Sequence, residues 1–213
     1  MNERIGVRRS IVMGALLALA VLAACGSSES DDEASAPPAA GGVRTYVGSA
    51  EGTSAFVAVV VDGARALAYV CDGMPGEPEG AVPALQAWFN GPSDGTAVDV
   101  QQPAGRLQAQ LTGSDLTGTL TLADGRTVPL TGHTVEGDAG LYRAESSGAD
   151  SEAVAGWILA ADGQQRGGVG TETGGTTRIS GARTLVLSQP TFTPQGLATA
   201  RISKVGITPI PIP

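Results

Sequence analysis

The chain has 213 residues, a formal net charge of −8 and two cysteines, Cys25 and Cys71. With one lysine and scattered arginines it lacks the clustered cations that nucleic-acid binding needs, so we expect no nucleic-acid partner. Two cysteines exclude a framework of several disulfides. His133 is the only histidine, which excludes a histidine-rich metal site.

Residues 1–24 have the pattern of an export signal. Arg4, Arg8 and Arg9 precede an apolar run over residues 11–24. A basic start, a short apolar run and small residues at its end are typical of a secretory signal peptide. The run is too short for a membrane-spanning helix, which needs about twenty apolar residues.

The signal ends in Leu22-Ala23-Ala24-Cys25, which resembles the lipobox of bacterial lipoproteins. The resemblance implies cleavage between Ala24 and Cys25, a diacylglyceryl group on the Cys25 thiol, and acylation of the new amine by a fatty acid such as palmitate. It places the protein on the outer face of the cytoplasmic membrane, because two or three acyl chains anchor a protein stably. An ordinary cleaved signal and an uncleaved anchor are the alternatives.

The segment 25–43 reads as the lipidated cysteine followed by a disordered acidic linker. Small, polar and acidic residues with proline and glycine bury too little apolar surface to fold. Eighteen such residues span about 25 Å on average. Removal of residues 1–24 takes away three arginines and one glutamate, so the formal charge falls from −8 to −10. A small acidic metal or partner site is the alternative interpretation.

Residues 44–188 are predicted to form one β-domain. Asp-Gly pairs, which suit two-residue hairpin turns, occur five times, at residues 62, 72, 94, 124 and 162. Three of them separate convincing strands. The apolar run over 55–61 predicts a strand covered on both faces, whereas the alternation over 116–123 predicts a half-buried one.

The fold class that follows is all-β. We expect an antiparallel meander of about eight to ten strands that forms a barrel or a sandwich, because closure removes exposed edges. One short amphipathic helix is expected near 82–89, and residues 182–188 are expected to form the last strand. Residues 189–213 contain five prolines and are predicted to be an extended tail, either loose or packed on the surface, or else an arm for a partner.

No catalytic, cofactor or metal site is predicted. A serine protease-like site would have to use His133, and the Gly-x-Ser-x-Gly elbow is missing. The glycine-rich stretches 167–170 and 174–175 lack the lysine of a phosphate-binding loop and are interpreted as loops. The carboxylate pairs Glu136 with Asp138 and Glu77 with Glu79 do not have EF-hand spacing.

Three further residues have two interpretations each. Cys71 closes an apolar run and is expected to be a small buried hydrophobic residue, with a reactive thiol as the alternative. Trp88 and Trp157 are expected to anchor the core, with a platform for stacking sugars as the alternative.

Segments 66–73, 140–144 and 156–159 with Asp162-Gly163 are similar to those of uncharacterised lipoproteins of high-GC actinobacteria. This resemblance implies a location and no activity. The leading hypothesis is a non-enzymatic, membrane-anchored lipoprotein whose β-domain binds a ligand, a lipid or an envelope protein. A secreted hydrolase and a structural or assembly role are the alternatives. A cavity left by Ala58, Ala68 and Gly118 would favour an apolar ligand, whereas a filled interior would favour binding at the surface.

Overall fold

The computed structural model describes residues 42–76, 81–194 and 196–206. These residues form antiparallel sheets, so the all-β prediction is confirmed. They include no helix that could span a membrane. The strands of the first sheet are β1 (Arg44–Ala50), β2 (Phe56–Asp62), β3 (Arg65–Cys71), β4 (Gln86–Pro92), β5 (Ala97–Gln102), β6 (Gly105–Thr112), β7 (Asp115–Leu122) and β8 (Thr127–Thr134). The other strands are β9 (Gly140–Ser147), β10 (Ser151–Leu159), β11 (Gln165–Thr173), β12 (Thr176–Gly181), β13 (Thr191–Phe192), β14 (Ala200–Arg201) and β15 (Ser203–Lys204).

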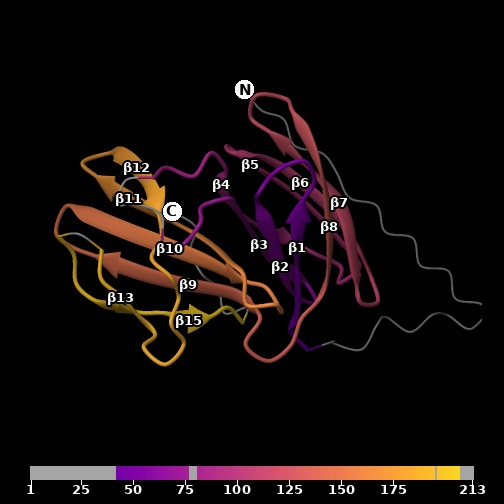
Figure 1. Ribbon diagram of the computed structural model, residues 1–213. Coiled ribbons are helices and arrows are strands. Elements are labelled where there is room, and N and C mark those ends of the chain that lie inside the picture. The colour runs from indigo at the N-terminus through magenta and orange to yellow at the C-terminus, as the bar shows by residue number, and fades with distance from the viewer. Residues whose placement is uncertain (1–41, 77–80, 195, 207–213) are drawn as a thin grey trace, which may run out of the picture. The chain divides into compact units, whose positions relative to one another are not determined.

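The first sheet is a meander that nearly closes into a barrel. The strands β1, β2, β3 and β4 pair in succession, as do β5, β6, β7 and β8, and β8 returns to pair with β1 (Figure 1). β4 and β5 are the two ends of this sheet, and an isolated bridge between Ser93 and Val98 joins them. Closure of this kind covers the edges that an open sheet would expose.

Asp-Gly turns join three of the hairpins, as their sequence predicts. Gly63, Gly125 and Gly163 have φ angles of 54°, 86° and 85°, which glycine adopts without strain. The Asp124 carboxylate accepts the Arg126 backbone N–H at 3.0 Å. These turns set the register of the strands on either side.

A single cluster of buried side chains fills the barrel. On β6, residues alternate between buried and exposed along the whole strand, so one face points inward. The cluster draws on all eight strands: Tyr46, Ala50, Ala55, Val57, Val59, Val61, Ala66, Ala68, Val70, Ala87, Phe89, Val98, Val100, Leu107, Ala109, Leu111, Leu116, Leu120, Val128 and Leu130.

Glycines bring neighbouring strands of the barrel unusually close. A Cβ built on Gly48 would lie 1.8 Å from the Thr131 carbonyl oxygen, and one on Gly118 would lie 2.2 Å from the Gln108 carbonyl oxygen. Glycine in a strand marks such sharp bends and close backbone approaches. The strands can therefore coil tightly enough to close the sheet.

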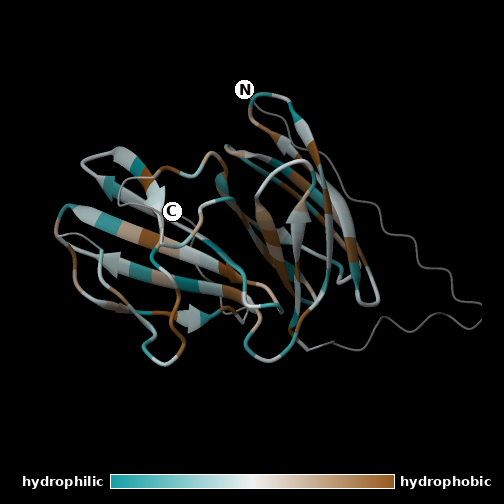
Figure 2. Ribbon diagram, viewed as in Figure 1, coloured by the Kyte–Doolittle hydropathy of each residue, from teal (hydrophilic) through white to brown (hydrophobic). Residues whose placement is uncertain are grey.

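The second sheet packs against the outer face of β1, β2 and β3. Its strand order is β12-β11-β10-β9-β15. Hydrophobic stretches lie on the strands where the two sheets face each other (Figure 2). The buried side chains of this second core are Val47, Ala58, Val60, Leu67, Tyr69, Cys71, Leu141, Ile158 and Val205. β2 and β3 are therefore covered on both faces, as the apolar run over 55–61 indicates.

The segment after β12 covers the other face of the second sheet. The Val205 N–H donates to the Leu141 carbonyl oxygen at 2.8 Å, where β15 lies beside β9. The third core comprises Tyr142, Ala144, Ala153, Ala155, Trp157, Leu159, Val169, Ala182, Leu185 and Ile202, with Phe192, Leu197 and Ala200 packed against it. Phe192, Leu197, Ala200 and Ile202 of the expected tail thus contribute to a core, and residues 195 and 207–213 lie outside the described residues.

Two predicted elements are wrong. The helix expected near 82–89 is absent, and its second half belongs to β4, which pairs with β3 along its whole length. Ala87 and Phe89 point into the barrel while Gln86 and Trp88 point out. This alternation is typical of a strand, but the spacing of the large apolar residues in 82–89 also fits a helix. Residues 182–188 form no strand, because β12 ends at Gly181 and its continuation crosses the face of the sheet.

Gly48→Ala tests the close approach that shapes the barrel. Because the added methyl would overlap the backbone of β8, we expect a loss of about 2–3 kcal/mol of unfolding free energy. Urea denaturation of the purified variant measures this loss. Gly206→Ala is the matched control, since a Cβ there meets no atom within 4 Å. Equal stability of the two variants would contradict the strand geometry.

Candidate functional site

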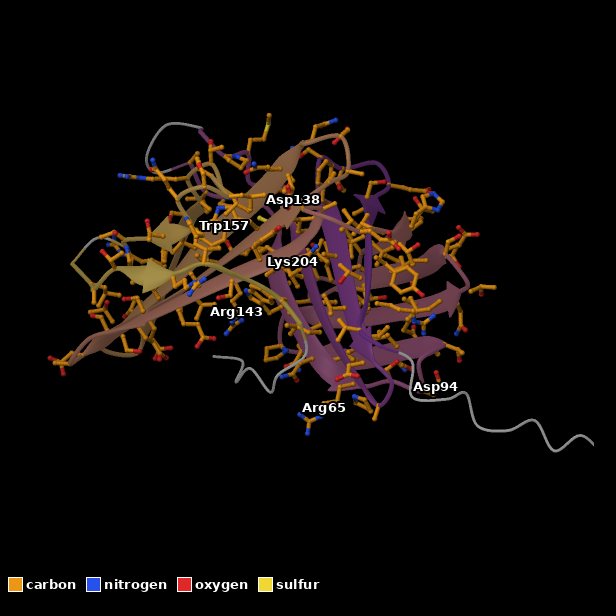
Figure 3. All side chains as sticks on the ribbon, turned by 90° about the horizontal axis from the view of Figure 1, so that it is seen from below. Arg65, Asp94, Asp138, Arg143, Trp157 and Lys204 are labelled. Carbon is orange, nitrogen blue, oxygen red and sulfur yellow. The ribbon has the colours of Figure 1, made fainter. Side chains whose placement is uncertain are left out.

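Three side chains form a stack where the barrel meets the second sheet. The rings of Tyr69 on β3 and Trp88 on β4 have centroids 4.2 Å apart and planes inclined by 29°. The guanidinium of Arg143 on β9, labelled in Figure 3, lies 4.7 Å from the Trp88 ring centroid, within the range of a cation–π interaction. The stack links one strand of the second sheet to two strands of the barrel.

Two paired glycines of the second sheet make room for this stack. Gly156 on β10 lies directly opposite Gly168 on β11. A Cβ on Gly156 would lie 2.5 Å from Trp88 Cζ2 and 2.8 Å from Tyr69 Cε1, and one on Gly168 would lie 2.0 Å from Gln86 Oε1. The missing side chains let the barrel strands lie directly on the second sheet.

The stretch Gly167–Gly170, interpreted from the sequence as a loop, is instead part of β11. It pairs with β10 on one side and with β12 on the other. A strand of glycines shows no alternation of polar and apolar side chains, so its pattern cannot reveal it. Gly174 and Gly175 do form a turn, with φ angles of 56° and 78°.

The junction holds polar groups in a largely buried setting. The Arg143 side chain is 4% exposed and its Nε donates to Glu145 Oε1 at 2.6 Å. Gln86 Oε1 and Trp88 Nε1 are buried without a hydrogen-bond partner among the described residues. An unsatisfied buried polar atom costs about 1–3 kcal/mol. The junction therefore holds one acceptor and one donor whose hydrogen-bonding capacity is unused within the described residues.

Burial also fixes the protonation of Tyr69 and Cys71. Burial, and next the neighbouring Cys71, raise the pKa of the Tyr69 phenol well above its ordinary value. Burial likewise raises the pKa of the Cys71 thiol. Cys71 is fully buried, as expected for a small hydrophobic residue. Both groups are neutral at pH 7, and a thiol that is not ionised is a poor nucleophile.

His133 lies on the exposed face of β8 beside an acid. Its Nδ1 is 2.9 Å from Asp115 Oδ1, and the two side chains are 78% and 60% exposed. The Ser114 hydroxyl donates to the same carboxylate oxygen at 3.3 Å. In a Ser-His-Asp triad the imidazole stands between the acid and the serine. Here the acid stands between them, so this arrangement does not activate Ser114.

An open recess of about 550 Å³ adjoins the start of β1. Its charged lining residues are Arg44, Glu136 and Lys204. The Arg44 guanidinium donates to the Gly95 carbonyl oxygen, and Lys204 Nζ donates to the Gly137 carbonyl oxygen at 2.5 Å. Both cations are thus engaged with backbone oxygens of neighbouring turns.

The remaining candidate residues are placed as follows. Within the described ranges no three His, Cys, Asp or Glu side chains are grouped closely enough to hold a metal ion. Asp138, the partner predicted for Glu136, accepts the Tyr142 hydroxyl through its backbone oxygen at 2.6 Å. Cys25, Ala24, Glu77 and Glu79 lie outside the described residues.

The two tryptophans have different settings. Trp157 is 2% exposed in the third core, and its Nε1 donates to the Arg183 carbonyl oxygen at 2.7 Å. It anchors the core, as expected. Trp88 is half-buried and its ring is engaged by Tyr69 and Arg143. Both rings thus serve packing between layers of the fold.

The small residues of the barrel do not open a cavity. Ala68 lies within the interior cluster, whereas Ala58 points outward into the core between the sheets. The space beside Gly118 is taken by the backbone of Gln108 and Ala109. The interior is filled, which is the outcome that favours binding at the surface over carriage of an apolar ligand.

Comparisons with protein families, with curated proteins and with solved structures find no match for this chain.

The raised pKa of Cys71 gives a pH-dependent contribution to stability. The Cys71 thiol ionises at about pH 8.5 in the unfolded chain. In the folded protein its raised pKa keeps the thiol protonated to a higher pH. The contribution is fully present below the unfolded pKa and is lost as the pH rises above it. In a Cys25→Ala background we expect the unfolding free energy to fall between pH 7 and pH 9.5, and Cys71→Ala to flatten that fall. Rapid reaction of the native thiol with a disulfide reagent at pH 8 would contradict its burial.

Proposed function

We propose that this chain is a lipid-anchored protein of the bacterial cell envelope whose β-domain binds a ligand or a protein partner. The observation that carries the proposal is the order of segments at the N-terminus: basic residues, an apolar run, Leu22-Ala23-Ala24-Cys25 and an acidic linker. This order is typical of lipoprotein export and leaves Cys25 as the nucleophile for lipid attachment.

Several contacts support binding rather than catalysis. Cys71 and Tyr69 are held neutral by burial, and Ser114 donates to Asp115 rather than to His133. These groups pack or pair within the fold, which is the setting expected of a domain that contributes surface rather than a reacting group.

The packing of the barrel supports a binding site on the exterior. The interior cluster draws on all eight strands of the barrel, and the outer face of β1 to β3 is covered by the second sheet. The outward face of β5 to β8 instead carries exposed threonine, glutamine and charged side chains. A partner would therefore meet polar strands and turns.

Cys25→Ala tests the anchor. We expect the variant to incorporate no labelled fatty acid and to leave the membrane fraction, because the proposed lipid attachment point is removed. Metabolic labelling and cell fractionation measure both effects. Cys71→Ala is the matched control, since it removes the other cysteine and should keep both the label and the membrane location. Unchanged fatty-acid labelling of Cys25→Ala would contradict the proposal.

The filled barrel has a consequence that native mass spectrometry can measure. The Cys25→Ala protein, which carries no covalent lipid, should be detected at the mass of the polypeptide alone. A species heavier by the mass of a lipid, and sensitive to collisional activation, would show that the domain holds an apolar ligand. That result would favour a lipid carrier over a binder of surface partners.

A further inference from the structure

β12 has one free edge. Among the described residues it pairs with β11 on one side only and ends the second sheet. Its first four residues, Thr176 to Ile179, are exposed. Exposed strand edges present unpaired backbone groups and are usually protected by short length, charge or covering segments. The strand is six residues long and contains no proline.

The hydrogen bonds at the end of β12 show which backbone groups point outward. The Gly181 N–H donates away from the sheet, to the Ala81 carbonyl oxygen at 2.8 Å, whereas the Ala182 N–H donates to Gly167 of β11 at 3.1 Å. In an antiparallel ladder this direction alternates from residue to residue. The N–H and C=O groups of Thr177 and Ile179 therefore point outward, with no hydrogen-bonding partner among the described residues.

Arg178 lies between these two residues and carries the only charge of the strand. Its side chain is exposed and makes no ion pair within the described ranges. Directly across the ladder it meets Thr171, which is neutral. A residue placed opposite Arg178 on an added strand would lie within reach of its guanidinium.

We propose that the free edge of β12 binds an extended segment of a partner protein by strand addition, with an acidic residue opposite Arg178. Main-chain hydrogen bonds to Thr177 and Ile179 supply the affinity, and the guanidinium selects the charge. On the added strand, the residues on either side of the acid would point to the same face of the sheet as Ile179, which is 39% exposed. Apolar side chains suit these positions.

Val82 adds apolar surface at the same edge. It is 66% exposed and directly follows Ala81, whose carbonyl oxygen is bonded to Gly181. An added strand that runs along β12 therefore ends beside it. The preferred segment has an acidic residue flanked by β-branched apolar residues.

A second copy of this chain is a poor occupant of the edge. In an antiparallel pair of two copies, Thr177 of one copy would pair with Ile179 of the other. This register places Arg178 of one copy directly opposite Arg178 of the other. Like charges directly opposite one another destabilise a ladder. The net charge of −8 adds repulsion between copies.

The experiment uses the full chain, labelled with nitrogen-15 in detergent micelles, and two capped peptides. One is Thr-Thr-Val-Glu-Val-Thr-Thr, and the other has lysine in place of glutamate. We expect the glutamate peptide to bind about fivefold more tightly and to shift the amide signals of Thr177 and Ile179. Arg178→Glu should reverse the preference, and Arg178→Gln should remove it.

Ile179→Pro is the second variant. It removes an outward N–H and leaves the ladder to β11 intact, so the protein should stay folded and bind neither peptide. Equal affinity for both peptides, signal changes confined to other strands, or an unchanged preference in Arg178→Glu would overturn the proposal. Concentration-dependent dimerisation that Ile179→Pro abolishes would overturn it too, because the occupant would then be a second copy. Loss of the lipid anchor changes none of these readings, so the two proposals can fail separately.

Discussion

The burial of β2 and β3 on both faces is the constraint on which the rest of the structure depends. One face of each strand fills the barrel and the other meets β9 and β10. Burying a valine or leucine side chain contributes about 1.5–3 kcal/mol, so these strands tie two layers into one fold. No disulfide takes part, since Cys71 is a free, buried thiol.

That double burial explains features that looked unrelated in the sequence. The glycines of β10 and β11 let Tyr69 and Trp88 lie against the second sheet, and Arg143 closes the stack. The same packing buries the apolar outer faces of β2 and β3. The two surfaces to which we assign binding are the polar outer face of the barrel and the free edge of β12, and both depend on backbone groups and single charges.

Local patterns predicted the parts of the fold that local chemistry determines. The Asp-Gly turns and the alternation along β7 identified hairpins and half-buried strands, because a turn and a pleat each depend on a few adjacent residues. The helix expected near 82–89 was wrong because pairing with β3 outweighs a helical spacing of large side chains. The glycine stretch of β11 was missed because its strand character comes from its neighbours.

The sequence by itself determined the all-β class and the hairpins of the barrel, since each depends on residues close together in the chain. Its first 25 residues are also the basis of the proposed lipid anchor. Only the tertiary structure decided that the barrel is filled, that the segment after β12 completes a third core, and that Thr177 and Ile179 lie on an open edge. These features depend on which strands far apart in the sequence become neighbours. That choice is made by side-chain packing and backbone pairing in the assembled sheets, and no short stretch of sequence contains it.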